Sequence, residues 1–164
     1  VLALELVGNG SLASGSADFS VKIWNWNRGA LFRTLTGHTG SVLSLKFVYV
    51  GENSLLASAS ADTTVHLWNV DLGTLVRTLS GHQASVQALD VLPDGTLLSG
   101  SLDTKAFVWN VTNGSLVQSL SISFPIYSLE VFNFKRMYIL TFFVNNNDYR
   151  LANKEKYIDL SADY

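Results

Sequence analysis

Three segments of this chain repeat one pattern at nearly constant spacing. Each segment contains a tryptophan, and the intervals between these tryptophans are 44 and 41 residues, at Trp24, Trp68 and Trp109. An aspartate precedes each of them by six residues, at Asp18, Asp62 and Asp103. A repeat of this length is one supersecondary unit that cannot bury its own apolar face, so successive units must stack to form a common core. The period therefore predicts an array of similar units.

Each unit is expected to form four short strands. Apolar side chains alternate with polar ones over a few positions, as at Val21 and Ile23. Turn-forming pairs such as Asn9-Gly10 and Asp94-Gly95 separate these runs, and they supply the positive φ angles that tight hairpins need. Residues 1–120 show no helical periodicity. Short alternating runs with such punctuation predict an all-β, antiparallel fold.

The composition excludes several classes of site. The formal net charge is −2, so the chain has no positive balance that would attract nucleic acid or an acidic membrane surface. There is no cysteine, so neither a disulfide framework nor thiolate metal ligands can form. The longest apolar run begins at Met137 and is far shorter than the roughly 20 residues that span a bilayer. We expect an intracellular protein, cytoplasmic or nuclear, because the lack of disulfides suits a reducing interior.

A Gly-His pair recurs between the units, at Gly37-His38 and Gly81-His82, and is followed by a Ser-x-Ser-x-Asp turn and then by Trp-Asn. In this order the residues resemble the WD-repeat (WD40) family, which has Trp-Asp where this chain has Trp-Asn. The resemblance covers residues 1–132 and implies a β-propeller, in which each four-stranded antiparallel sheet is one blade around a central channel. It implies blades at residues 1–36, 37–80 and 81–120 and the start of a fourth blade from residue 121.

The propeller is expected to be an incomplete ring, because the chain holds only about three to four blades. The match ends near Asn133, and all twelve glycines lie at or before Gly114. Residues 133–164 are interpreted as a divergent tail, either a degenerate fourth blade or a terminus outside the propeller. Both interpretations stay open. Because the first residue is Val1, we also expect the chain to be a piece of a longer protein.

Serine, histidine and aspartate at fixed spacing suggest nucleophilic catalysis, in which histidine accepts the serine proton and a carboxylate orients the histidine. Their recurrence in successive units argues against one tuned active site. In the resembled family these residues instead form a structural network in which aspartate holds histidine, histidine holds serine, and serine reaches the indole N–H of tryptophan. Buried tryptophan and histidine side chains need such partners.

We expect this structural role for the sets in the second and third units, which are His38, Ser58, Ser60, Asp62 and Trp68, and His82, Ser99, Ser101, Asp103 and Trp109. The first unit has the same set without a histidine, at Ser14, Ser16, Asp18 and Trp24. Which of the two serines completes each network stays open. No catalytic, cofactor-binding or metal-binding residue is expected, and no cofactor.

Partners of the family commonly dock on the face formed by the loops that enter the first strand and that join the second strand to the third. Here these loops carry small or neutral side chains, at Thr39, Ser41, Gln83, Ser85 and Leu102. A phosphopeptide or a nucleic acid would require clustered arginine or lysine, and none maps to this face.

Four other residues carry separate expectations. Arg33 and Arg77 recur on the fourth strand, where a solvated outer edge is expected. His66 is expected to be a partly exposed strand residue and not a metal ligand, because no second ligand recurs near it. Trp26 is expected to pack in the core or at a blade edge, with an interface anchor as the alternative.

These features predict a protein–protein interaction scaffold without catalytic activity of its own, which displays its loops to a protein or peptide partner. Two alternatives stay open: a catalytic or small-ligand-binding propeller with its site in the central channel, and a truncated product without independent function. Open blade faces also predict self-association or poor solubility, because repeat arrays need capping or closure. The sequence names neither the partner and pathway nor the total blade number.

Overall fold

The computed structural model describes residues 1–8, 10–50, 53–134, 137–142 and 154–158. In these residues the regular structure is β-strand throughout, arranged as three four-stranded sheets and one three-stranded sheet. Neighbouring strands within each sheet are antiparallel. No helix that could cross a membrane is present among them. The all-β antiparallel prediction is therefore confirmed.

Each four-stranded sheet contains four consecutive strands in chain order. The first blade consists of β1 (Ala3–Val7), β2 (Ser11–Gly15), β3 (Val21–Asn25) and β4 (Ala30–Leu35). The second consists of β5 (Val42–Val50), β6 (Asn53–Ser60), β7 (Val65–Asn69) and β8 (Thr74–Leu79). The third consists of β9 (Val86–Val91), β10 (Leu97–Ser101), β11 (Lys105–Trp109) and β12 (Leu116–Ser121). Each strand thus pairs with its neighbour in sequence, as in a propeller blade.

A three-stranded sheet follows the third blade. It consists of β13 (Leu129–Phe134), β14 (Met137–Phe142) and β15 (Lys154–Ile158). Ile126 and Leu129 belong to an apolar cluster with Leu98 and Val108 of the third blade. This sheet therefore stacks on the third blade, and two of its strands lie within the divergent tail at 133–164.

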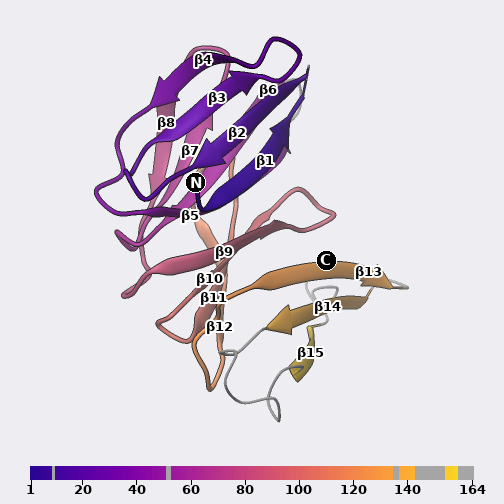
Figure 1. The fold of residues 1–164 in the computed structure, drawn as a ribbon. Helices are drawn as coiled ribbons and strands as arrows, with labels where there is room; N and C mark the ends of the chain where they lie inside the picture. Colours follow the sequence, from indigo (N-terminus) through magenta and orange to yellow (C-terminus); the bar gives the residue numbers. More distant parts are fainter. Residues whose placement is uncertain (9, 51–52, 135–136, 143–153, 159–164) are drawn as a thin grey trace.

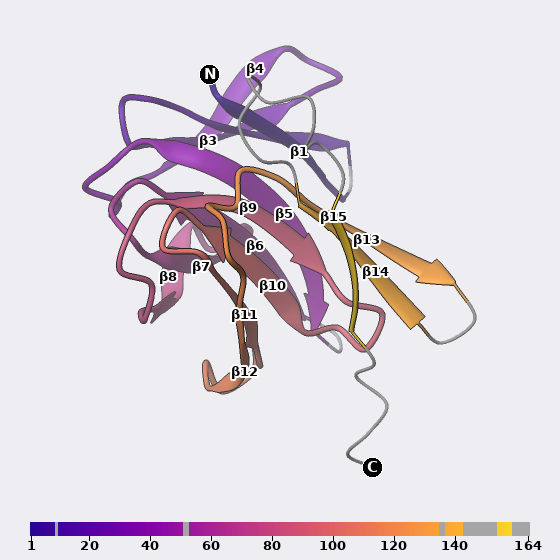
Figure 2. The ribbon, with the colours of Figure 1, turned by 90° about the horizontal axis from the view of Figure 1, so that it is seen from below.

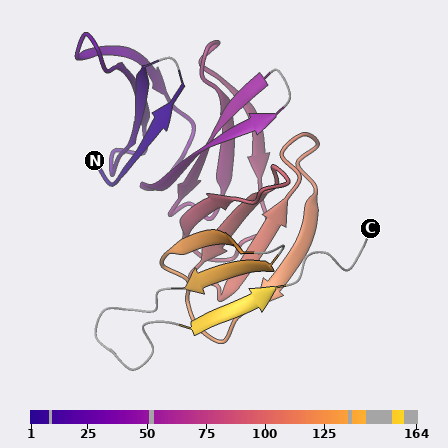
Figure 3. The same ribbon diagram turned by 90° about the vertical axis from the view of Figure 1, so that its right-hand side faces the viewer.

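The sheets follow one another around an arc that does not close into a ring (Figures 1 and 3). The first strands contact one another in the order β1, β5, β9 and β13, and they form the inner edge of the arc (Figure 2). The incomplete propeller predicted from the repeat is confirmed.

The apolar core lies between the blades. Ile23 and Leu35 of the first blade pack with Leu56 and Trp68 of the second in one cluster of buried residues. A second cluster joins the second blade to the third in the same way. Because strand side chains alternate between the two sheet faces, each blade has one apolar face toward the preceding blade and one toward the next.

Two kinds of turn recur in every blade. The turn before the fourth strand has a glycine with positive φ, at Gly29, Gly73 and Gly114. In the turn before the third strand, the aspartate accepts the backbone N–H two residues later. The residue between them has positive φ, at Phe19, Thr63 and Thr104. Such angles are uncommon for these residue types, so the aspartate turn stabilises a conformation that the sequence did not predict.

Candidate functional site

The four side chains of the second blade form one continuous hydrogen-bonded chain. His38 Nδ1 lies 2.7 Å from Asp62 Oδ2, and His38 Nε2 lies 2.8 Å from Ser58 Oγ. Trp68 Nε1 donates to the same Ser58 Oγ at 2.8 Å. A carboxylate only accepts hydrogen bonds, so His38 donates from Nδ1 to Asp62, and the Ser58 hydroxyl donates to Nε2. Each side-chain N–H and O–H that links these four residues then has an acceptor.

The third blade repeats this arrangement with nearly the same distances. His82 Nδ1 lies 2.8 Å from Asp103 Oδ2, and His82 Nε2 lies 2.8 Å from Ser99 Oγ. Trp109 Nε1 donates to Ser99 Oγ at 2.8 Å. Each residue of the third-blade network makes the same contacts as its counterpart in the second blade.

These distances are those of a Ser-His-Asp triad, but the environment of the serine differs. Ser58 and Ser99 are both 0% exposed. Each serine oxygen also accepts an indole N–H, which occupies one of its two lone pairs. A triad serine must instead be open to substrate and poised next to an oxyanion hole. The arrangement can therefore hold a blade together, and it offers no accessible nucleophile.

The second serine of each pair has a different task. Ser60 Oγ donates to the Gly40 carbonyl at 2.9 Å and accepts the Asp62 backbone N–H. Ser101 Oγ makes the corresponding bonds to the Ala84 carbonyl and the Asp103 N–H. The serines that complete the networks are thus Ser58 and Ser99, a choice that the sequence left open.

The first blade has half of the network. Trp24 Nε1 donates to Ser14 Oγ at 2.8 Å. Among the described residues no histidine reaches Ser14 or Asp18. Asp18 instead accepts the Ser20 hydroxyl and backbone N–H, while Ser16 Oγ accepts the Asp18 N–H. The Ser20 hydroxyl is the main reason why the pKa of Asp18 is lowered to about 2.

Burial and hydrogen bonds set the charge states in the complete networks. Burial alone would raise the pKa of Asp62, but the Thr64 hydroxyl, the Thr39 N–H and His38 together hold it well below its ordinary value. The pKa of Asp103 is lowered against the same burial effect by Gln83 N–H and His82. Burial lowers the pKa of His82. The network of the third blade therefore pairs an ionised Asp103 with a neutral His82.

His66 is buried, at 6% exposure, so the prediction of a partly exposed residue was wrong. Its ring stacks on that of His38 with centroids 3.8 Å apart. Phe107 stacks on His82 in the same way, at 4.1 Å. His66 Nδ1 has no hydrogen-bond partner, and burial followed by the nearby His38 lowers its pKa to about 4. An aromatic ring thus packs on the network histidine in both blades. The alternation of residues along the strand did not indicate this stack.

Arg33 and Arg77 also differ from expectation, because both reach across to the next blade. Arg33 Nη2 donates to the Asp71 carbonyl at 2.8 Å, and Arg77 Nη2 donates to the Thr112 carbonyl at 3.2 Å. Both side chains are half-buried, and their Nε atoms are buried. Each arginine therefore links its blade to the turn that contains Gly73 or Gly114.

Trp26 is 67% exposed, so it is neither a core residue nor packed at a blade edge. The equivalent residues in the next two blades, Val70 and Val111, are 8% and 6% exposed. Val70 and Val111 are buried because the preceding blade packs against the second and the third blade.

The loops named as the partner-docking face lie side by side in pairs. The Ser41 carbonyl accepts the Ala61 N–H, and the Ser85 carbonyl accepts the Leu102 N–H. Thr39 N–H and Gln83 N–H donate to the network aspartates. The side chains of Thr39 and Gln83 are exposed, and those of Ser41, Ser85 and Leu102 are half-buried. The networks thus hold these loops in place.

Sequence reasoning missed a row of charges on the first strands. Glu5 Oε1 accepts the Phe47 N–H at 2.9 Å, and Asp90 Oδ2 accepts the Val131 N–H at 2.7 Å. Lys46 Nζ lies 3.0 Å from Asp90 Oδ1. Glu5, Lys46 and Asp90 occupy the same position in successive repeats, and alignment of the repeats would have found them. They connect neighbouring first strands.

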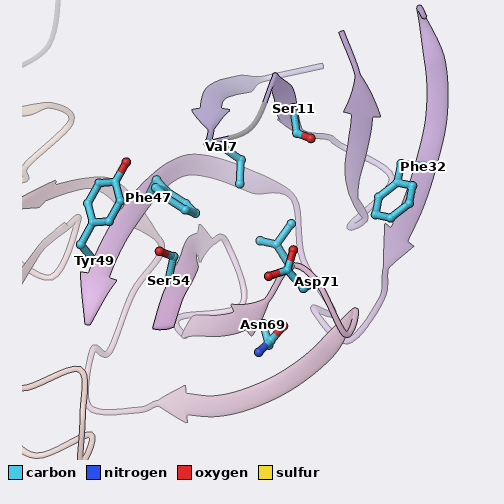
Figure 4. Close-up of a pocket in the computed structure, with 10 residues that line it drawn as sticks. Val7, Ser11, Phe32, Phe47, Tyr49, Ser54, Asn69 and Asp71 are labelled. Carbon is cyan, nitrogen blue, oxygen red and sulfur yellow. The ribbon is translucent and has the colours of Figure 1, made fainter. Parts of the chain in front are cut away.

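One pocket of about 360 Å³ lies between the first and second blades. Figure 4 shows Phe47 and Tyr49 of β5 on one side and Phe32 of β4 on the other, with Asn69 and Asp71 beside them. Its lining includes no histidine, lysine or arginine. The described residues also contain no cluster of three or more metal-ligating side chains.

Comparison with solved structures identifies the same architecture. The crystal structure of the computationally designed Ika4 protein matches with a TM-score of 0.77, and it covers 96% of this chain and 89% of that one. The two sequences are 24% identical, so the likeness concerns the fold alone.

Comparison with curated proteins gives short matches. A stretch of 37 residues is 62% identical to "Nuclear distribution protein PAC1-1" of Uncinocarpus reesii. A stretch of equal length is 57% identical to "Nuclear distribution protein PAC1" of Ajellomyces capsulatus. Each match spans 23% of this chain and 8% of the relative's length.

The sequence pattern of the family described as "WD domain, G-beta repeat" matches residues 1–25, 29–69 and 73–110. These ranges cover more than half of the chain and contain the repeated aspartates and tryptophans of all three blades. The chain belongs to the WD40 repeat family.

Proposed function

We propose that this chain is an intracellular, non-catalytic interaction platform that binds a protein or peptide partner through the loops of one propeller face. One observation carries this proposal. The side chains with catalytic potential are used twice over in identical buried networks, and those networks fix the exposed loops. The histidine, serine and aspartate side chains thus stabilise the loops of this face.

The chemistry of the loops suggests the kind of partner. Thr39 and Gln83 are exposed and uncharged, and their backbone N–H groups are held by Asp62 and Asp103 at 2.9 Å. A neutral surface favours a partner that supplies backbone hydrogen bonds and small apolar contacts. Because the loops are already held in place, they lose little conformational entropy when the partner binds. An extended peptide segment or a folded domain of low charge fits this description.

The test compares loop variants with a control in purified form and in cells. Thr39→Arg and Gln83→Arg place a bulky charge on the loop face but keep the backbone bonds to the aspartates. Leu72→Arg introduces the same charge at an exposed turn before the fourth strand (68% exposed). We expect the two loop variants to lose the partners that cross-link to the wild-type chain and to keep its melting temperature.

The control should keep both the partners and the melting temperature. Equal loss of partners in all three variants would argue against this face. A turnover that His38→Ala or His82→Ala abolishes without lowering the melting temperature would instead favour a catalytic propeller.

A further inference from the structure

The pocket between the first and second blades lies at one end of the strands. Most of its lining comes from the β1–β2, β5–β6 and β7–β8 turns and from the strand residues beside them. The loops of the proposed partner-docking face lie at the other end, before each first strand and between each second and third strand. The pocket is therefore a surface separate from the one on which the proposed function rests.

Three aromatic rings line the sides of this pocket. Phe47 and Tyr49 lie on β5, with their rings edge to face and their centroids 5.0 Å apart. Phe32 lies on β4 at the opposite side (Figure 4). Tyr49 is 72% exposed and Phe32 is 59% exposed. The faces of such rings attract cations, and the guanidinium carbon of Arg33 already lies 5.0 Å from the centroid of Phe32.

One charged side chain lines the pocket, and it is Asp71. Its turn is held from two sides, because Asn69 Oδ1 accepts the Leu72 N–H at 2.8 Å and Arg33 Nη2 donates to the Asp71 carbonyl at 2.8 Å. Among the residues that the structure describes, no basic side chain forms an ion pair with Asp71. A fixed turn therefore presents an unpaired negative charge beside the aromatic rings.

An extended hairpin supplies one wall of the pocket. β5 has 9 residues and β6 has 8, whereas the first two strands of the first and third blades have 5 or 6. Tyr49 pairs with Ser54 in this hairpin, and both line the pocket. β1 ends at Val7, whose repeat counterpart is Val48. The ladder that places Tyr49 at the pocket is thus absent from the first blade.

The repeat shows that blade packing does not require these residues. The interface between the second and third blades has aliphatic side chains and a neutral hydroxyl at the four corresponding positions. They are Val76, Val91, Pro93 and Thr112, in place of Phe32, Phe47, Tyr49 and Asp71. Both interfaces bury an apolar cluster. The stacking of the blades therefore does not account for three aromatic rings and a carboxylate at the first interface.

The chemistry of the lining selects a cation. The Asp71 carboxylate repels anions and attracts a positive charge, and the ring faces add to that attraction. A lysine side chain has a compact ammonium at the end of a flexible apolar stem. The stem can pack along the rings of Phe47 and Tyr49 while the ammonium stays at the open side of the pocket beside Asp71.

We propose that this pocket binds a lysine side chain from a peptide segment of a partner protein. The ammonium pairs with the Asp71 carboxylate, and the methylene groups pack against Phe47 and Tyr49. The site does not depend on the loop face, so Thr39→Arg and Gln83→Arg leave its affinity unchanged. Failure of one site is therefore distinguishable from failure of the other.

An NMR titration of the full chain at low ionic strength tests this site. The probe is Nα-acetyl-lysine methylamide, and its matched neutral analogue is Nα-acetyl-norleucine methylamide, which has an apolar side chain without the ammonium. We expect the lysine probe to shift the ring resonances of Phe47 and Tyr49 in a saturable way. The norleucine probe should bind about fivefold more weakly. Added salt should weaken the lysine probe alone, because it screens the charge of Asp71.

Two variants locate the binding site. Asp71→Asn removes the charge and keeps the shape, and the first blade already has asparagine at this repeat position, Asn27. Tyr49→Leu removes an exposed ring and keeps an apolar side chain. Each should weaken binding of the lysine probe about threefold or more and leave the melting temperature unchanged. Glu130→Gln, which removes an exposed carboxylate on β13, should leave the affinity unchanged.

Three results would overturn the proposal. The first is equal binding of the lysine and norleucine probes, which would make the pocket a site for apolar groups. The second is full affinity in Asp71→Asn or Tyr49→Leu. The third is an equal loss in Glu130→Gln, which would assign the binding to the net charge of the chain.

Discussion

At the scale of single residues, the serine in the middle of each blade has different hydrogen-bond partners in different blades. Ser58 Oγ accepts the indole N–H of Trp68 and bonds His38, and all three side chains are buried. Ser14 in the first blade accepts only the Trp24 N–H, and Trp24 is half-buried. Serine at this repeat position thus binds a buried imidazole and a buried indole in the second blade, but only a half-buried indole in the first blade.

Replacement of these serines by alanine should show the difference. Ser58→Ala leaves a buried indole N–H and an imidazole nitrogen without partners, and we expect a loss of about 2 to 3 kcal/mol in the free energy of unfolding. Ser14→Ala should cost about 1 kcal/mol or less, because water can reach the Trp24 N–H. Urea unfolding followed by tryptophan fluorescence measures both. Equal losses would mean that the histidine adds nothing to the network.

At the scale of strands and turns, the glycine before the fourth strand has two separate roles in the second and third blades. Its positive φ closes the hairpin, and its missing side chain leaves room for the arginine of the preceding blade. Gly73 has both roles, since its added Cβ would meet Arg33 at 2.5 Å. Gly29 has the first role alone among the described residues.

Alanine at these two glycines should separate turn strain from blade contact. Gly29→Ala should cost about 1 to 2 kcal/mol, the penalty of a left-handed conformation for a residue with Cβ. Gly73→Ala should cost about 1 kcal/mol more, because it also displaces Arg33 from the Asp71 carbonyl. In the Arg33→Ala background the two costs should become equal. Urea midpoints of the wild type, Arg33→Ala and the four glycine variants check this, and a difference that persists without Arg33 would contradict it.

At the scale of the whole molecule, the core exists only between neighbouring blades. The three buried clusters join the first blade to the second, the second to the third, and the third to the sheet of β13–β15. Charge pairs such as Lys46 and Asp90 follow the same pattern. Because no blade buries its apolar faces alone, we expect the described blades to unfold together.

Stability should fall as the pH drops from about 6.5 to 4. Burial and His38 lower the pKa of His66 to about 4 in the folded chain, whereas an unfolded imidazole keeps a pKa near about 6.5. In this window the unfolded chain binds a proton that the folded chain excludes, which favours unfolding. Burial lowers the pKa of His82 and acts in the same direction. The lowered pKa values of Asp62 and Asp103 act only at more acidic pH.

His66→Phe tests this assignment, since Phe107 already fills the same position in the third blade. The variant should gain about 1 kcal/mol at pH 7, because it removes a buried nitrogen without a partner. Its urea midpoint should also depend less on pH between 7 and 4. The reverse change, Phe107→His, should lower the midpoint and steepen the pH dependence. An unchanged pH profile in both variants would contradict the role given to His66.

Much of the architecture followed from the repeat. Strand alternation, Gly-containing turns and the spacing of Trp24, Trp68 and Trp109 sufficed for the blades and for the incomplete ring. The composition of the hydrogen-bonded sets was expected from the resemblance to the WD-repeat family, and it agrees with the need of a buried indole N–H for an acceptor. These properties depend on local pattern and on chemistry that every repeat shares.

The remaining features depend on which surfaces meet. Ser58 and Ser60 are alike in sequence, and only the approach of His38 from another loop distinguishes them. Trp26 and Val70 share one repeat position, and only the presence of a preceding blade buries the second of them. The sequence by itself determined the blade, since its pattern is local. The tertiary structure decided which side chains are buried, because burial is a property of two blades in contact.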